Sequence, residues 1–145
     1  MSLEIRGADQ LAKLAKDLKQ AGEKDLAKEL NAAMREAVEP GKEKIKAAAR
    51  RDLPSRGGFG RKVSQMRFSA RVSSRSGLRL VARHRYQLAL IDEGAVKHPL
   101  FGDRDHWYLT IFSPHVLSDA WESNAPEVRS RAAAGAQRVA DKIGR

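Results

Sequence analysis

The sequence contains no cysteine, and aromatic residues make up only 6% of it. Without cysteine the chain can form neither disulfide bonds nor thiolate metal sites, and it has no cysteine nucleophile. No apolar run approaches the length of a membrane-spanning helix, and the segment from Met1 to Gln10 lacks the apolar core of a signal peptide. These absences predict a soluble protein in a reducing compartment.

Acidic residues are missing from one internal segment, and this absence locates the charge of the protein. The 145 residues carry a formal net charge of +10. Residues 1–60 contribute +3 and residues 92–145 contribute −1, whereas residues 61–91 hold eight Lys or Arg and no Asp or Glu. A surface of that kind attracts phosphate backbones or an acidic protein partner. Composition does not choose between these two partners.

The length predicts a single domain that covers residues 1–145. Apolar residues recur at helical spacing through residues 8–52, which are predicted to be helical, with Pro40 either kinking one long helix or starting a new one. The glycine-rich residues 53–62 are predicted to form a mobile loop. They do not fit a phosphate-gripping loop, because the flanking sequence predicts neither a strand before them nor a helix after them.

A β-hairpin is the clearest strand pattern in the chain. Apolar residues from Met66 to Val72 and from Leu78 to Ala82 alternate with polar ones, and the sequence SSRSG between them is typical of a turn. The second face carries five arginines with no acid to relieve their repulsion: Arg67, Arg71, Arg79, Arg83 and Arg85. This face is either a solvated surface or a binding surface, and the pattern leaves both open.

The rest of the chain predicts a sheet over residues 63–112 and a helix over residues 115–143. Residues 86–92 either continue the hairpin or form a third, more buried segment, and alternation from Trp107 to Phe112 predicts a last strand. A helical apolar stripe runs from Leu117 to Ile143, with Pro126 at the start of a helix or at a kink.

The stretch HPLFGDRDHW, residues 98–107, concentrates side chains of catalytic and metal-binding types. Its metal-ligand types are His98, Asp103, Asp105 and His106, but their spacing matches no metal motif. Ser113 and His115 lie nearby, but no nucleophile elbow or oxyanion glycine pattern accompanies them. Asp92 and Glu93 fit ordinary strand-end residues better than an acid–base pair. The sequence therefore favours neither a metal site nor a hydrolase.

A nucleic-acid-binding protein is one interpretation of this chain. The basic segment would bind duplex phosphates without sequence preference. No helix-turn-helix or zinc-finger pattern is visible, and Phe68 falls on the apolar side of the hairpin, away from the arginines. The arginine face therefore lacks an aromatic platform for single strands.

The order of the predicted elements resembles that of the neck, or head–tail joining (tail-completion), proteins of long-tailed bacteriophages. It is most similar to the versions from phages of actinobacteria. Glu93-Gly94 is followed by residues 98–102, HPLFG, and by Trp107, where the family has a similar E-x-G, HP-x-FG and W before a proline and a C-terminal helix. The likeness covers residues 8–143. The segment HWYLTIFSPHVL departs from the family, which is more polar there and has a glycine after the proline.

The resemblance implies a non-enzymatic virion protein without a cofactor or metal. Its fold would be α+β, with N-terminal helices and a C-terminal helix packed on a small antiparallel β-sheet. Copies of the chain would form a ring that joins the DNA-filled head and portal to the tail and lets DNA pass. The implied partners are other copies, portal or head-completion proteins and tail terminator proteins, with non-specific contact to passing DNA and no membrane. The protein would be made in the host cytoplasm and end in the virion neck.

Two groups of residues are predicted to carry this function. The five arginines would line the DNA channel or meet an acidic partner. A joining loop would be shaped by His98, Pro99, Phe101, Gly102 and Trp107. In that loop Leu100, Phe101 and Trp107 are expected to anchor a turn to the core, which leaves three charged residues exposed for salt bridges to a neighbouring subunit: Asp103, Arg104 and Asp105.

Overall fold

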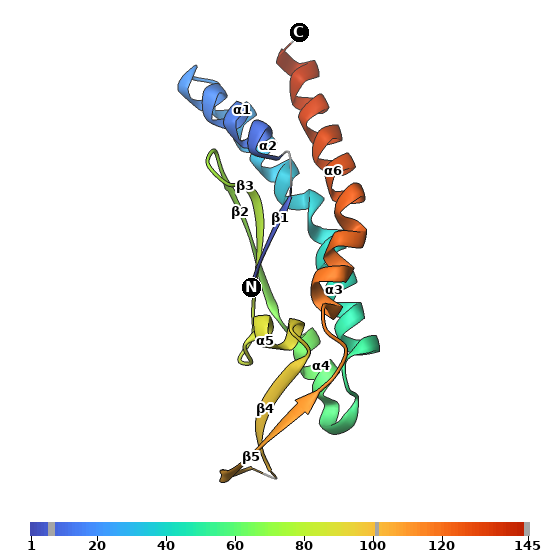
Figure 1. Cartoon of the computed structure of the whole chain (residues 1–145). Coiled ribbons are helices and arrows are strands. Elements are labelled where there is room, and N and C mark those ends of the chain that lie inside the picture. Colours follow the sequence, from blue (N-terminus) through green and yellow to red (C-terminus); the bar gives the residue numbers. More distant parts are fainter. Residues whose placement is uncertain (6–7, 101, 144–145) are drawn as a thin grey trace.

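Helices and two small antiparallel sheets build the protein, as the α+β prediction requires (Figure 1). The computed structural model describes residues 1–5, 8–100 and 102–143. A long helix and a helical N-terminal region run along the molecule, and a separate β-hairpin projects at one end (Figure 1). Among the described residues, no helix is both long enough and apolar enough to cross a membrane.

Three helices form most of the predicted helical region: α1 (Ala8–Gln20), α2 (Lys24–Ala37) and α3 (Glu39–Asp52). Pro40 stands in the first turn of α3, so it starts a new helix rather than kinking a long one. The apolar stripes are buried as their spacing predicts, and Leu30, Met34 and Ala49 have no exposed surface.

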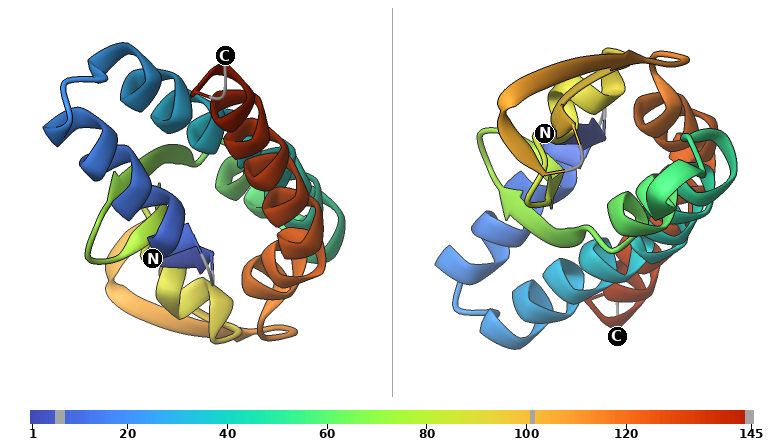
Figure 2. Two further views of the ribbon diagram at one scale, coloured as in Figure 1. Left: turned by 90° about the horizontal axis from the view of Figure 1, so that it is seen from above. Right: turned by 90° about the horizontal axis from the view of Figure 1, so that it is seen from below.

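The C-terminal helix α6 (Val116–Ile143) packs on α2 and α3 and lies side by side with α3 (Figure 2). A Cβ built on Gly135 would lie only 2.5 Å from Ala33 Cβ, and one built on Gly41 would lie 2.6 Å from the Trp121 ring. Both glycines therefore allow these helices to approach more closely than any larger residue would. Pro126 lies inside α6, so it does not start a helix.

The first sheet has the strand order β1 (Ser2–Ile5), β3 (Gly77–Arg83), β2 (Arg67–Ser73), with both pairings antiparallel. Leu80 pairs with Leu3 on one side and with Ala70 on the other, and Leu78 pairs with Ile5. These side chains form the inner face, which the helices cover, and both leucines of β3 are fully buried. The predicted hairpin is confirmed, and its apolar face is part of the core.

Two short segments differ from the sequence predictions. Residues 53–62 are not a loop throughout, because they contain a 3-10 turn (Arg56–Gly58) and the start of α4 (Phe59–Ser64). Val63 is fully buried, and a Cβ on Gly60 would lie 2.6 Å from the Ala49 carbonyl oxygen, so this helix is held against α3. Tertiary packing thus overrides the local glycine signal.

The second difference lies within residues 86–92, where the chain forms a helix, α5 (Leu88–Asp92), and no strand. Leu88 and Ile91 are both buried and stand three residues apart, a spacing that suits a helical turn as well as an apolar run. The predicted sheet over residues 63–112 is therefore divided into two sheets. The second sheet is the hairpin of β4 (Ala95–Leu100) and β5 (Asp103–Ile111).

Asp92 joins α5 to the start of α6. Its Oδ1 accepts hydrogen bonds from the N–H groups of Leu117 (2.9 Å) and Ser118 (3.0 Å), and its carbonyl oxygen accepts one from His115 (2.6 Å). His115 adopts a left-handed φ of 63°, which turns the chain into α6. Asp92 is therefore not an ordinary strand-end residue: it caps a helix that begins more than twenty residues later.

Replacing Asp92 with alanine should lower the free energy of unfolding by about 1–2 kcal/mol, because two N–H groups at the start of α6 lose their acceptor. Asp92→Asn keeps a side-chain oxygen and should lose less. Urea unfolding followed by circular dichroism measures both. Asp119→Ala is the control, since Asp119 is an exposed acid in the same helical turn with no capping bond. Equal losses for Asp92→Ala and Asp119→Ala would contradict the capping role.

Candidate functional site: an exposed arm and a basic sheet face

The β4–β5 hairpin, called the arm below, projects from the end of the molecule (Figure 1). Its register pairs Ala95 with Ile111, Lys97 with Leu109 and Pro99 with Trp107. Because neighbouring residues on a strand point to opposite faces, these six side chains share one face of the arm, called the outer face. The arm is a two-stranded sheet, so each strand also has a free edge.

The outer face is largely apolar and open to solvent, and Lys97 is its one charged member. Trp107, Leu109 and Ile111 are 50%, 62% and 77% exposed, respectively. The expectation that Trp107 anchors a turn to the core is therefore wrong: the ring lies on the surface, where its Nε1 donates to the Arg104 carbonyl oxygen at 2.6 Å. A two-stranded hairpin is marginally stable alone in water, and exposed apolar clusters mark contact sites.

The other residues of the predicted joining loop are distributed over this arm. His98 lies on the inner face, where its Nε2 is 2.9 Å from Thr110 Oγ1, and Pro99 stands opposite Trp107 at a register shift. Gly102 lies at the tip with a left-handed φ of 83°. Phe101 and the side chain of Leu100 lie outside the described residues. The segment is thus a hairpin rather than a single turn packed on the core.

Charged residues form the tip of the arm. Asp103, Arg104 and Asp105 are exposed, as predicted. Asp103 Oδ1 accepts from the Asp105 N–H at 3.0 Å, and Oδ2 lies 2.7 Å from His106 Nδ1. These two contacts, the backbone one first, hold the pKa of Asp103 below its ordinary value. Among the described residues, no three His, Asp or Glu side chains come together as a metal site would need.

Aromatic side chains support the base of the arm. Phe59 lies with its ring centroid 5.8 Å from that of Tyr86 and 5.7 Å from that of Phe112. The inner face of the arm, with Val96 and Tyr108, borders a groove of about 590 Å³ whose far side includes Phe59. A Cβ built on Gly94, at a φ of 87°, would lie 2.6 Å from the Phe112 carbonyl oxygen, so only glycine fits where the arm begins.

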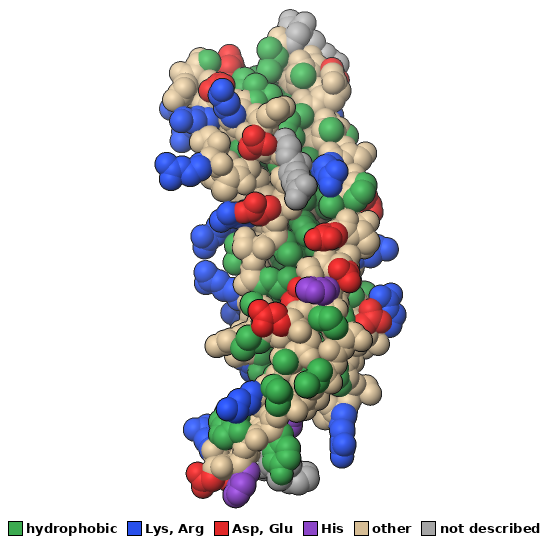
Figure 3. Space-filling view, viewed as in Figure 1, with side chains coloured by type: hydrophobic (Ala, Val, Ile, Leu, Met, Phe, Trp, Pro, Cys, Tyr) green, Lys and Arg blue, Asp and Glu red, His purple; other side chains and the backbone are tan. Residues whose placement is uncertain are grey.

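The solvent-facing side of the first sheet, called the basic face below, carries four of the five predicted arginines. Arg67 stands directly opposite Arg83, and Arg71 stands opposite Arg79. Lys and Arg side chains appear along the edge of the molecule where β2 and β3 lie (Figure 3). Like charges directly opposite in a sheet destabilise the pairing, so this arrangement is costly in the absence of a counter-ion.

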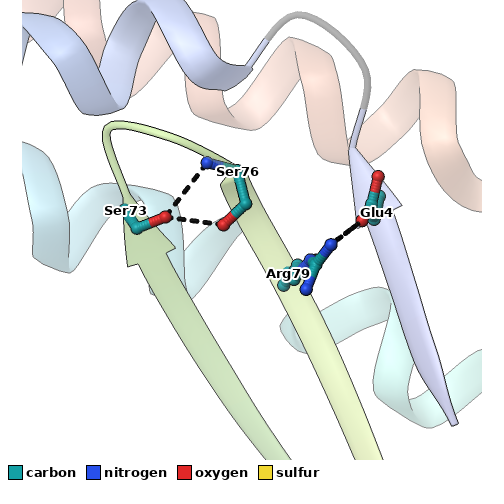
Figure 4. A network of polar contacts seen from close by, with 4 residues as sticks. All are labelled: Glu4, Ser73, Ser76 and Arg79. Atoms are coloured by element: carbon teal, nitrogen blue, oxygen red, sulfur yellow. Dashed lines mark hydrogen bonds and ion pairs between the residues drawn. The ribbon is translucent and has the colours of Figure 1, made fainter.

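One arginine has an acidic partner that the sequence does not reveal. The Arg79 Nε donates to Glu4 Oε1 at 2.8 Å, across the β1–β3 pairing (Figure 4). The expectation of a face without acid is therefore wrong at this position. Figure 4 also shows the turn of the hairpin, where the Ser76 N–H donates to Ser73 Oγ at 3.1 Å. Ion pairing leaves Arg79 less available for an external anion than Arg67 or Arg83.

At the end of the basic face away from the hairpin turn, the surface forms a hollow of about 720 Å³, called the basic hollow. It is lined by Arg61 and Lys62 from α4, by the Arg67–Arg83 pair, and by Gln65, His84 and Arg85. No apolar side chain lines it. Among the described residues, no carboxylate forms a salt bridge with any of these basic side chains. Arg61 and Lys62 directly precede the hairpin in the sequence, and α4 brings them to its open end.

Arg85 lies beyond the end of β3 rather than on its face. Its guanidinium lies 4.9 Å from the Tyr86 ring centroid and donates to the Tyr86 hydroxyl at 2.9 Å. Next to it, His84 Nδ1 accepts from the Tyr86 N–H at 3.2 Å. Burial lowers the pKa of His84; a hydrogen bond with the Lys62 backbone opposes this decrease, and the charge of Arg85 adds to it. His84 is therefore neutral at neutral pH.

Acidification should destabilise the protein through His84. Its pKa is lower in the folded chain than in the unfolded chain, so the unfolded state binds the proton first and stability falls as the pH drops below about 6.5. The loss is complete once the pH is below the folded pKa. Urea midpoints measured between about pH 7.5 and pH 5 should fall less for His84→Gln than for the wild type. Identical pH dependence in the two proteins would contradict this assignment.

No protein-family model, curated protein or solved structure matches this chain. The two surfaces themselves therefore provide the structural basis for a function. The arm offers apolar contact area at one end of the molecule, and the basic hollow offers concentrated positive charge without apolar side chains.

Sequence patterns identified parts of both surfaces. The alternation around Trp107 correctly predicts a strand, but it does not show that both faces of this strand are exposed. The aromatic contacts of Phe59 were missed, because the glycines around it suggest a loop. The only feature of the sequence that indicates packing of Phe59 is the presence of a large aromatic residue among glycines.

Proposed function

We propose that the chain is a structural, non-enzymatic subunit of the neck of a long-tailed bacteriophage, where copies form a ring between the head portal and the tail. The exposed outer face of the arm carries this proposal. Three large apolar side chains on a projecting two-stranded sheet are unfavourable in water and suit burial against another protein. The resemblance of residues 93–107 to the head–tail joining family indicates that this other protein is a component of the phage neck.

The position of the arm favours a ring. The arm projects from one end of the molecule, whereas α1, α2 and the last turns of α6 lie at the other end (Figure 1). An arm that contacts the body of the next copy makes a head-to-tail, heterologous contact, and such contacts close into rings when the rotation between copies allows it. The charged tip would then form salt bridges with the neighbouring copy or with a portal or tail terminator protein.

Electron microscopy of the protein mixed with portals or isolated tails tests the proposal. We expect rings seated on one of these structures, and mass spectrometry of purified particles should detect the chain. The genes beside its own should encode portal, capsid and tail-tube proteins. A chain that stays monomeric with both structures, is absent from particles and binds duplex DNA as a monomer would overturn the proposal in favour of a sequence-independent nucleic-acid-binding protein.

A further inference from the structure

The basic hollow lacks the features of a protein-binding site. Interfaces between proteins depend on apolar and aromatic side chains at their centre, surrounded by a polar rim. Every side chain that lines the hollow is polar or charged, and five of the seven are Lys or Arg. The hollow therefore suits a negatively charged partner that binds through electrostatic attraction rather than through apolar contacts.

The facing arginine pairs favour a partner that carries negative charge. The repulsion between Arg67 and Arg83 is not relieved by any salt bridge among the described residues. An external anion would relieve it, and a guanidinium donates paired hydrogen bonds that match the oxygens of a phosphate. The two arginine pairs are four residues apart on each strand, which is about 13 Å. That distance corresponds to roughly four base-pair steps at about 3.4 Å each along the axis of a DNA duplex.

The surface between the two pairs allows a long polymer to lie across it. Ser69, Val81 and Ser2 occupy the row between the arginine pairs, and their short side chains leave room for a backbone to approach the sheet. Among the described residues, no Phe, Trp or Tyr lies on this face of the sheet, and the Tyr86 ring beside the hollow already contacts Arg85 and Phe59. Single-stranded nucleic acid gains most of its non-electrostatic affinity by stacking on such rings, so a duplex suits this surface better.

We propose that the basic hollow, together with the Arg67–Arg83 pair at its edge, binds the phosphate backbone of double-stranded DNA without reading its sequence. Arg61 and Lys62 on α4 extend the site beyond the sheet, and Arg85 is held in place by Tyr86. Arg79 contributes little, because Glu4 already pairs with it. In the neck ring this site would contact the DNA that passes, and in that respect the assignment rests on the proposed function.

Fluorescence anisotropy with a short labelled duplex tests the site on the purified chain, and requires no ring. Arg67→Gln/Arg83→Gln should raise the Kd roughly tenfold and reduce the slope of log K against log salt by about 1.8, since each lost phosphate contact contributes about 0.9. The control is Arg129→Gln/Arg138→Gln, which removes the same charge from the exposed side of α6. Removing a repulsive pair should not impair folding, and thermal unfolding checks this.

Three results would overturn the assignment. They are no duplex binding by the wild type at about 50 mM salt, equal weakening in the two double variants, and preference for single-stranded DNA. Competition with polyglutamate adds a fourth, because a carboxylate polymer that displaces the duplex equally well per charge would mean that the hollow takes an acidic protein. Failure of ring formation leaves these measurements intact, so the two proposals fail separately.

Discussion

Replacing Trp107, Leu109 and Ile111 with threonine should abolish incorporation into the ring while the isolated chain stays folded. These side chains are at least half exposed in the free chain, so their loss removes few contacts within it. Burying each one against a neighbour is worth about 1.5–3 kcal/mol. Their combined loss, on the order of 5 kcal/mol, weakens association by roughly 10³- to 10⁴-fold. Threonine suits a strand, so the hairpin itself is retained.

A matched control removes exposed apolar side chains from elsewhere on the protein. Leu14, Leu90 and Ile143 are 38%, 47% and 50% exposed and lie outside the arm. Their triple replacement with threonine should leave incorporation unchanged. Ring formation is scored by electron microscopy with portals or tails, and the fold by circular dichroism. Normal ring formation by the arm variant would refute the role of the outer face, whereas loss in both variants would indicate a general effect of surface polarity.

Leu80→Ala should produce the largest loss of stability among single changes in the sheet, about 2–5 kcal/mol. Leu80 is fully buried at the centre of the middle strand, between Leu3 and Ala70. Its truncation leaves a cavity between the sheet and the helices that the central strand cannot move to fill. Since small domains unfold with about 5–15 kcal/mol in total, a loss of this size removes a large part of the stability.

Val81→Ala is the control for this prediction, because Val81 is the next residue and lies on the opposite, basic face. Its truncation should cost less than about 1 kcal/mol. Urea unfolding of the two variants compares the faces of one strand directly. Equal losses would show that the inner face is not the core side of the sheet.

Hydrophobic periodicity in the sequence correctly predicted the β2–β3 hairpin and most of the helices. Period-two alternation predicted the β2–β3 hairpin with the correct buried face. The apolar residues Leu78, Leu80 and Ala82 share one face of the strand, and that face is buried. Helical stripes gave most of the region 8–52 and the C-terminal helix. The resemblance to the neck family remains a prediction of function that the fold class alone does not decide.

Contacts between distant residues account for what the sequence did not reveal. Glu4 pairs with Arg79 across 75 positions, and Asp92 accepts a hydrogen bond from the Leu117 N–H, 25 positions later. Asn124, with its amide oriented for hydrogen bonding, accepts from the Gly41 N–H at 3.1 Å, which satisfies a donor in the first turn of α3. No local sequence pattern predicts these pairs, because their residues are close in space but far apart along the chain.

The exposed face of the arm could not be predicted for a different reason. Trp107 and Leu109 are residues that usually lie inside a protein, and alternation indicates which residues share a face but not what covers that face. The sequence therefore placed Trp107 in the core, whereas the structure leaves half of its surface in water.

The pairing of β1 with β3 affects the order in which the chain acquires structure during synthesis. Residues 2–5 leave the ribosome well before their partner strand, which ends at residue 83, and α6 packs on α2 and α3 only once residues 116–143 are made. At about 5–20 residues per second, β1 waits several seconds for its partner. We expect the nascent chain to expose Leu3, Ile5 and the apolar sides of α2 and α3 during that time, and to depend on chaperones until α6 is complete.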